Sequence, residues 1–120
     1  MGRSYRDLSV WQLSMDLVDA VYDATENFPK RELFGLSAQM RRAAVSIPSN
    51  IAEGQSRLSG GPFRLFLGHA RGSLAELSTQ IEITHRRGFI KEDARKDLNE
   101  RCDKVGKLLN GLLESIKHRP

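Results

Sequence analysis

The chain has 120 residues, 39% of them hydrophobic and 28% charged, which allows one domain with a single core and excludes several ordinary domains. No apolar run approaches the roughly 20 residues of a membrane span, and the polar N-terminus lacks the apolar core of a signal peptide. The single Cys102 excludes an internal disulfide framework. We therefore expect one cytoplasmic domain over residues 1–120, without a membrane segment.

The formal net charge of +4 is spread unevenly along the chain. Residues 1–29 carry two basic and five acidic groups, whereas residues 30–90 carry nine basic and four acidic groups. Most cations of this middle segment are arginines, which suit both bidentate phosphate contacts and ion pairs at protein interfaces. Charge alone leaves three alternatives open: a nucleic-acid surface, a protein interface and a solvated face.

The first helix is predicted over residues 10–27. Apolar or small residues recur at steps of three and four and predict one buried face: Trp11, Met15, Val18, Tyr22 and Thr25. Ser9 followed by Gln12 has the pattern of a capping box at the helix start. Pro29 predicts the helix end, because the residue before a proline is disfavoured in helical geometry.

The second helix is predicted over residues 36–56. Its apolar face is formed by Leu36, Met40, Ala43, Ile47 and Ile51. Pro48 interrupts this pattern and leaves the carbonyl of Ala44 without its usual hydrogen-bond partner, so a kink is expected. Because the apolar register continues on both sides of Pro48, one bent helix is favoured over two short ones.

The third and fourth helices are predicted over residues 62–87 and 91–118. The third has the most regular seam of the chain: Phe63, Leu67, Ala70, Leu74, Leu77, Ile81 and Thr84. The fourth repeats the pattern with Leu98, Cys102, Val105, Leu109, Leu112 and Ile116. Pro62 suits the start of a helix, and Gly88 suits a left-handed residue just beyond its end. With no competing strand signal, the pattern predicts an all-α, up-down-up-down antiparallel four-helix bundle.

Catalytic and metal-binding patterns are missing from the sequence. The three histidines, His69, His85 and His118, lack the spacing of a metal-binding helix or a zinc finger. Cys102 falls on the apolar seam, where a cysteine is typical of a core, and Ser73 lies mid-helix without a nucleophile elbow. We therefore expect no catalytic residue, no cofactor and no metal.

Two stripes remain to be explained. A polar stripe on the second helix contains Arg42, Ser46, Ser49, Asn50 and Glu53, continuing to Arg57. It indicates a hydrogen-bond network at a subunit interface, a ligand groove or a solvated face. A stripe of small residues on the third helix contains Gly68, Gly72, Ala75 and Thr79. It indicates close packing, either inside the bundle or against another subunit.

Several segments resemble a known family. The run from Arg41 to Gly54, RRAAVSIPSNIAEG, and the preceding Phe34-Gly35-Leu36 and Gln39 are similar to the four-helix bundle family encoded within intervening sequences of 23S ribosomal RNA genes. Shorter matches include Tyr5-Arg6-Asp7-Leu8, Val10-Trp11-Gln12, Phe28-Pro29, Phe66-Leu67 and the run from Ala70 to Leu77. The resemblance implies a cytoplasmic bacterial protein that assembles as a homopentameric ring and has no established catalysis. Accessory proteins of diversity-generating retroelements, which are basic and bind nucleic acid, are distantly similar.

Together these observations favour a non-enzymatic oligomeric scaffold that binds RNA or DNA. Its predicted contacts are arginines of the basic middle segment: Arg41, Arg57, Arg64, Arg71, Arg86 and Arg87. The lack of aromatic residues outside the predicted core argues against single-strand stacking and favours backbone contacts. The alternatives are a protein-interaction ring without nucleic-acid binding, and a small-molecule binder that uses the polar stripe.

Overall fold

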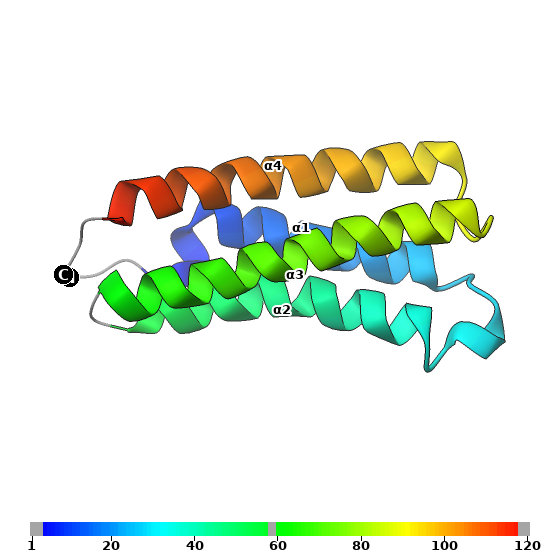
Figure 1. Cartoon of the computed structure of the whole chain (residues 1–120), viewed down its shortest axis with the longest axis horizontal. Coiled ribbons are helices and arrows are strands. Elements are labelled where there is room, and N and C mark those ends of the chain that lie inside the picture. The colour runs from blue at the N-terminus through cyan, green and yellow to red at the C-terminus, as the bar shows by residue number, and fades with distance from the viewer. Residues whose placement is uncertain (1–3, 58–59, 118–120) are drawn as a thin grey trace.

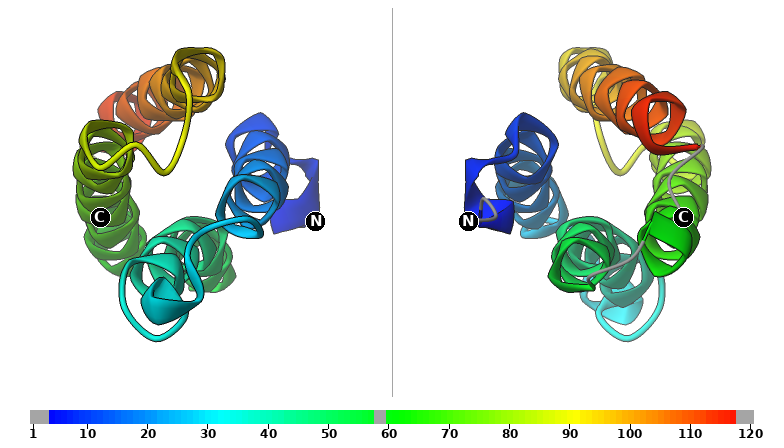
Figure 2. Two further views of the ribbon diagram at one scale, coloured as in Figure 1. Left: turned by 90° about the vertical axis from the view of Figure 1, so that its right-hand side faces the viewer. Right: turned by 90° about the vertical axis from the view of Figure 1, so that its left-hand side faces the viewer.

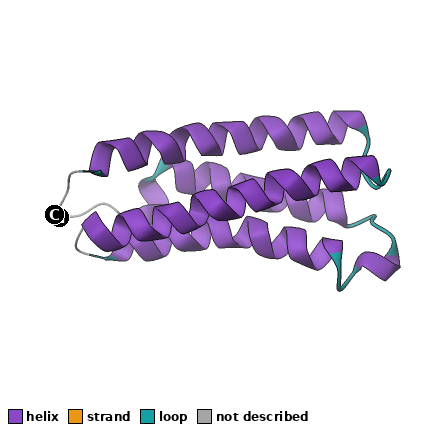
Figure 3. Cartoon of the chain, in the orientation of Figure 1, coloured by secondary structure: helices purple, strands orange, loops and turns teal. Residues whose placement is uncertain are grey.

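Four helices form the molecule. The computed structural model describes residues 4–57 and 60–117, and within them the helices are α1 (Ser9–Thr25), α2 (Leu36–Ser56), α3 (Gly60–Arg86) and α4 (Glu92–Ile116). Two single 3-10 turns, η1 (Tyr5–Asp7) and η2 (Lys30–Glu32), precede α1 and α2. The helices lie side by side in an elongated bundle of 46 × 24 × 20 Å (Figures 1 and 3). The described residues contain no strand, so the prediction of an all-α four-helix bundle is confirmed.

The observed helix bounds lie within two residues of the predicted ones, wherever both fall in the described part of the chain. The predicted end of the fourth helix, residue 118, lies outside it. Helix α2 continues through Pro48. Beside the proline, Asn50 Nδ2 donates to the carbonyl of Ser46 at 2.8 Å, and Ser49 Oγ donates to the carbonyl of Val45 at 2.8 Å. These side chains bind backbone carbonyls at the turn that the proline interrupts.

The seams of α2, α3 and α4 form the core as predicted. All seven seam residues of α3 are buried. Helix α4 buries Leu98, Cys102, Val105, Leu109 and Ile116, and helix α2 buries Met40, Ala43, Ile47 and Ile51. Leu36 and Leu112 are partly buried against this cluster. Burial of these aliphatic side chains is the main source of stability in such a bundle.

The predicted inward face of α1 is wrong except at Thr25. The face that the structure buries is Val10, Ser14, Leu17, Val21 and Thr25. Met15 is 40% exposed and Tyr22 is 44% exposed, while Trp11 and Val18 are only partly buried. Helix α1 carries apolar side chains on two adjacent faces, and steps of three and four fit both. As a result α1 keeps an apolar stripe that the bundle covers only in part.

The start of α1 also differs from the prediction. Ser9 lies inside the helix, the N-cap is Leu8, and no side chain caps the first turn. Gln12 Nε2 instead donates to the carbonyl of Arg6 at 2.9 Å. The predicted capping box is therefore wrong, because η1 supplies a hydrogen-bonded turn immediately before the helix.

Gly88 closes the α3–α4 connection as expected. Its φ of +76° is the only positive value among the described residues. The amide of Phe89 donates to the carbonyl of Thr84 at 2.9 Å, and the amide of Gly88 donates to the carbonyl of His85 at 3.0 Å. This pair of bonds is a Schellman motif, which satisfies carbonyls that the helix end leaves open.

Gly54 allows a close approach of α2 and α3. A Cβ atom at this position would lie 2.9 Å from Phe63 Cδ1 and 3.0 Å from Phe66 Cβ. The two helices can therefore pack closely here because Gly54 has no side chain. Helix α4 also contacts α1, and the end-on views show the four helices arranged around the core (Figure 2). Among the described residues, no helix combines the length and apolarity that crossing a bilayer requires.

Candidate nucleic-acid interface

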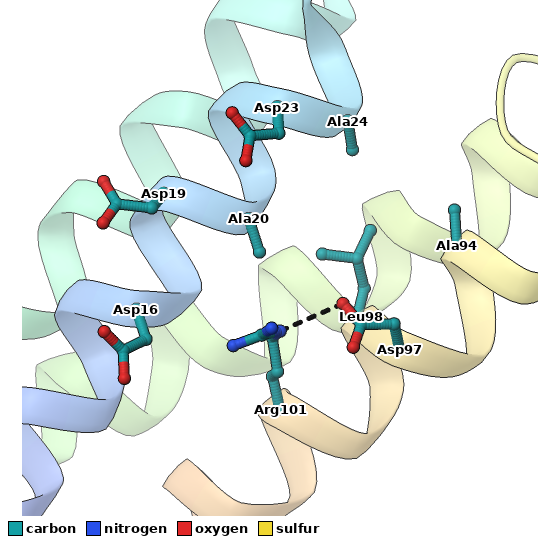
Figure 4. Close-up of a pocket in the computed structure, with 9 residues that line it drawn as sticks. All are labelled: Asp16, Asp19, Ala20, Asp23, Ala24, Ala94, Asp97, Leu98 and Arg101. Carbon is teal, nitrogen blue, oxygen red and sulfur yellow. Dashed lines mark hydrogen bonds and ion pairs between the residues drawn. The ribbon is translucent and has the colours of Figure 1, made fainter.

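One groove of the molecule is acidic. It has a volume of about 600 Å³ and lies between α1 and α4, with Asp16, Asp19 and Asp23 on one side and Asp97 on the other (Figure 4). Arg101 forms an ion pair with Asp97, Nε to Oδ2 at 3.0 Å, so one of the four carboxylates is neutralised. Ala20, Ala24, Ala94 and Leu98 complete the lining. A negative groove of this kind repels a polyanion, so the α1 side of the bundle is unsuited to nucleic acid.

A second groove, between α3 and α4, has the opposite character. We call it the basic groove; its volume is about 360 Å³, and Arg71 and Lys107 line it from the two helices. Arg71 Nη1 donates to Asn110 Oδ1 at 3.4 Å, which orients the guanidinium along the groove. Asp103 is the one acidic residue of the lining. This shallow groove presents two exposed cations and one amide, and phosphate oxygens accept hydrogen bonds from such donors.

The floor of the basic groove is apolar and chemically inert. Leu74, Ala75 and Gly106 contribute to it, and Cys102 lies at its base. Burial raises the pKa of the Cys102 thiol to about 11, so the thiol stays protonated at neutral pH. The expectation that Cys102 is a core residue is consistent with this environment. The groove therefore offers charge and hydrogen-bond donors but no activated nucleophile.

The end of the bundle beside the basic groove carries two further predicted arginines. Arg64 Nη1 donates to the carbonyl of Ile116 at 3.0 Å, which joins the start of α3 to the end of α4. Arg57 forms an ion pair with Glu53, Nη2 to Oε2 at 3.3 Å, and its guanidinium lies 5.3 Å from the centroid of the Phe66 ring. Both side chains are thus held by the protein while remaining at its surface.

The opposite end carries Arg86 and Arg87. Both are exposed, and neither side chain has a partner within residues 4–57 and 60–117. Lys91 in the same connection is also exposed. Arg31 of η2 approaches them, since its guanidinium lies 5.8 Å from the centroid of the Phe89 ring. These cations extend the positive surface, but about a full helix length separates them from Arg64.

Arg41 is held between two helices. Its Nε donates to Thr25 Oγ1 at 2.8 Å, and its guanidinium lies 4.8 Å from the centroid of the Tyr22 ring. The side chain joins α2 to α1 and is half-buried. We therefore leave Arg41 out of the candidate surface.

The polar stripe of α2 divides into separate contacts. Asn50 Nδ2 donates to Ser46 Oγ at 2.9 Å, and Ser46 Oγ shares a hydrogen bond of 2.8 Å with Ser73 Oγ on α3. Ser46 and Asn50 are thus bonded to each other, and Ser46 also bonds to Ser73, a partner that the pattern alone did not identify. Glu53 pairs with Arg57, whereas Ser49 bonds only to its own helix. Arg42 is exposed and joins none of these contacts in the described part of the chain.

The stripe of small residues faces outward. A Cβ atom at Gly68 or Gly72 would meet nothing within 4 Å. Ala75 and Thr79 are exposed as well. Packing inside this bundle therefore does not explain the stripe, and a contact with another subunit remains the open alternative.

An ion-paired cluster separates the two basic ends of the α3–α4 face. Arg95 Nε lies 2.9 Å from Glu82 Oε2, and Arg95 Nη1 lies 2.9 Å from Glu92 Oε1. The hydrogen bonds from Arg95 and Asn99 lower the pKa of Glu82, and those with Glu82 and Glu92 raise the pKa of Arg95. His85 Nε2 also lies 3.1 Å from Glu92 Oε2. No group of three or more potential metal ligands comes together in the described residues.

Sequence reasoning missed Lys107 and Asn110. A signal for both exists, because residues equally distant from the turn of an antiparallel helix pair come face to face. Residues 71 and 107 are equally far from Phe89, and Asn110 lies one turn beyond Lys107 on α4. Pairing the third and fourth helices about Phe89 would have placed Lys107 and Asn110 near Arg71.

The fold and the grooves define a helical-bundle protein whose described residues contain no cluster suited to metal binding. A family model described as 23S rRNA-intervening sequence protein matches residues 6–111, and the chain belongs to this family. A solved structure is similar to it: a protein with unknown function from the S23 ribosomal protein family of Bacteroides thetaiotaomicron VPI-5482. The alignment has 22% identity and a TM-score of 0.80, and it covers 88% of this chain and 95% of that one, which supports the fold alone. No curated protein matches the chain.

Proposed function

We propose that the protein is a non-enzymatic scaffold that forms a homo-oligomer and binds the phosphate backbone of RNA or DNA at the basic groove. The observation that carries the proposal is the placement of Arg71 and Lys107 from two helices on one shallow groove, with Asn110 beside them. In this proposal, consecutive helices run in opposite directions and α2 bends at Pro48. Five copies of the chain form a ring, as the family resemblance implies. The resemblance also favours the bacterial cytoplasm as its location.

Backbone binding fits the chemistry of the groove better than base recognition. Its lining contains no aromatic side chain on which a base would stack, whereas cations and an amide bind phosphate without regard to sequence. Arg64 lies seven residues before Arg71, which is two helical turns along the same side of α3. Several copies of this surface in an oligomer would contact one nucleic acid together and strengthen binding through multivalency.

The distribution of charge supports one orientation of the nucleic acid. The acidic groove on the α1 side excludes a polyanion, and the basic groove on the α3 side attracts it. The nucleic acid therefore contacts α3 and α4, while α1 faces away from it.

The test is a fluorescence anisotropy titration of a labelled duplex RNA and a labelled duplex DNA between about 50 and 200 mM salt, a range over which phosphate contacts weaken strongly. The double variant Arg71→Gln/Lys107→Gln should bind more weakly, and the slope of log affinity against log salt should fall by about one for each phosphate that the variant no longer neutralises. The matched control is Lys96→Gln/Lys104→Gln, which removes the same charge from exposed positions outside the basic groove.

Equal weakening in both double variants would show that only overall charge matters and would refute the groove as the site. If the folded, oligomeric wild-type protein binds neither duplex at about 50 mM salt, nucleic-acid binding is wrong. A protein-interaction ring then replaces it as the function.

A further inference from the structure

Two connections of the bundle meet at one end of the molecule. Residues 26–35 connect α1 to α2, residues 86–93 contain the connection from α3 to α4, and both segments lie at the right-hand end of Figure 1. Ring contacts join them: the centroids of the Phe28 and Phe89 rings lie 5.5 Å apart, and the Arg31 guanidinium lies 5.8 Å from the Phe89 centroid. We call these two segments the turn end. Neither the basic groove nor the acidic groove includes any of its residues.

The turn end holds an aromatic ring in water. Phe34 is 92% exposed, and the neighbouring Leu33 is 51% exposed. The backbone that carries the ring is well bonded, since the amide of Gly35 donates to the carbonyl of Glu32 at 3.0 Å and the amide of Leu36 donates to Glu32 Oε1 at 3.2 Å. The ring is therefore presented to solvent on a hydrogen-bonded turn. The sequence-based expectation that aromatic residues are lacking outside the core is wrong at this position.

The turn end also carries cations that the protein does not neutralise. Its exposed basic residues are Lys30, Arg31, Arg86, Arg87 and Lys91. Apart from Arg31, which packs against Phe89, their side chains have no partner among residues 4–57 and 60–117. Three of the four carboxylates in the same segments already accept hydrogen bonds within the chain: Glu32, Asp93 and Glu92. Cations without a partner attract a polyanion to this end.

An exposed ring on the same surface as unpartnered cations fits an unpaired nucleic-acid strand. Proteins bind single strands by stacking bases on aromatic side chains and by holding phosphates with cations. A duplex cannot use the ring in this way, because its bases are already stacked on one another. An anionic membrane fits less well, since a flat bilayer pressed against the turn end would also meet the exposed carboxylates of Glu26 and Asp93. A strand follows a narrow path and contacts the cations alone.

We propose that the turn end is a second nucleic-acid site, which binds an unpaired strand of RNA or DNA by stacking a base on Phe34 and holding the neighbouring phosphates with its cations. This inference goes beyond the proposed function. The basic groove takes the backbone of a duplex and has no aromatic side chain in its lining, whereas the turn end takes a strand whose bases are free to stack. The two sites share no residue, so each can be tested without the other.

The experiment measures, by fluorescence anisotropy, the affinity for a labelled single strand of about 10 nucleotides without self-complementarity. Phe34→Leu keeps an apolar side chain but removes the stacking ring, so the affinity should fall at least about fivefold. Phe34→Trp restores a ring and should bind at least as tightly as the wild type. The matched control is Leu33→Ala, which removes an exposed apolar side chain beside the ring and should bind like the wild type. Affinity for a duplex should be the same in all three variants.

A second pair of variants tests the cations. Arg86→Gln/Arg87→Gln should weaken single-strand binding, and the slope of log affinity against log salt should fall by about 0.7 for each phosphate that is no longer neutralised. Arg71→Gln/Lys107→Gln removes the same charge from the basic groove and should change the single-strand slope less. All substituted positions of the turn end are exposed, so each variant should keep the wild-type circular dichroism spectrum.

The inference is overturned if Phe34→Leu binds the single strand like the wild type, or if Leu33→Ala loses as much affinity as Phe34→Leu. It is also overturned if Phe34→Ser lowers the mass measured by light scattering, because the ring would then contact another subunit. Loss of binding to vesicles of anionic phospholipid in Phe34→Ser, with single-strand affinity unchanged, would assign the turn end to a membrane instead. A wild type that binds the duplex but no single strand refutes only this inference. A wild type that binds the single strand through Phe34 but no duplex refutes only the proposed function.

Discussion

Replacing Gly54 by alanine tests how closely α2 and α3 approach each other. The new Cβ would lie 2.9 Å from Phe63 Cδ1 and 3.0 Å from Phe66 Cβ, and real Cβ atoms are not found so close to other carbons. Phe63 is 6% exposed, so its ring is surrounded and cannot simply turn away. Overpacking of this kind costs about 1–3 kcal/mol, whereas alanine in place of a mid-helix glycine gains about 1 kcal/mol. Two contacts at 3.0 Å or less place the cost in the upper part of its range, so we expect a net destabilisation of about 1–2 kcal/mol.

Gly111→Ala is the control for this variant. A Cβ atom at Gly111 would meet nothing within 4 Å, and the residue lies within α4. Only the helix-propensity gain remains there, so this variant should be stabilised by about 0.5–1 kcal/mol. Both free energies of unfolding are measured by urea denaturation, followed by circular dichroism at one protein concentration. If the free energy of unfolding of Gly54→Ala equals or exceeds that of the wild type, the close packing of α2 on Phe63 and Phe66 is refuted.

Two further predictions concern titratable groups. Because burial raises the pKa of Cys102 to about 11, a maleimide reagent should label the native protein far more slowly than the urea-unfolded protein at neutral pH. The same shift of the Cys102 pKa predicts that the free energy of unfolding is unaffected below the ordinary thiol pKa of 9.0 and declines as the pH rises from there toward 11, since only the unfolded thiol ionises in that range. Rapid labelling of the native protein would contradict the burial of the thiol. A free energy of unfolding that does not decline relative to that of Cys102→Ala would contradict the pKa shift. The pKa of Glu82, lowered by its hydrogen bonds from Arg95 and Asn99, should appear below 4.5 in a carboxyl NMR titration and rise in Arg95→Ala; an unchanged midpoint would show that the pair does not persist in solution.

The sequence was sufficient for the fold wherever one face of a helix is unambiguous. Helix α3 has a seam of seven residues at steps of three and four, and its other large apolar residues, such as Leu65 and Ile83, do not form a second face, so the buried seam positions could be predicted. Gly88 was predictable for a similar reason, because a glycine after a helix end has a specific backbone role. In α1 the apolar residues cover two adjacent faces. Periodicity cannot choose between Leu17 on one and Met15 on the other, since the choice depends on where α2 and α4 lie.

The candidate site was predictable only in part, because side-chain partners depend on tertiary pairing. The basic middle segment includes Arg71, but Lys107, which lines the same groove, comes from a helix 36 residues later in the chain. Arg41 shows the reverse case: an arginine in a basic segment is held by Thr25 and Tyr22 from another helix. Composition counts charges, and only the packed structure shows which of them already have a partner.

The contact between α1 and α4 has a consequence for the order in which the molecule folds. The pairs α1–α2, α2–α3 and α3–α4 each join neighbours in the chain, and such local contacts form quickly because closing them costs little chain entropy. Only the α1–α4 contact joins the two ends of the sequence, and the acidic groove lies along it. During synthesis α1 can settle on α2 before α4 exists. The last helix then completes the bundle by docking on both α3 and α1.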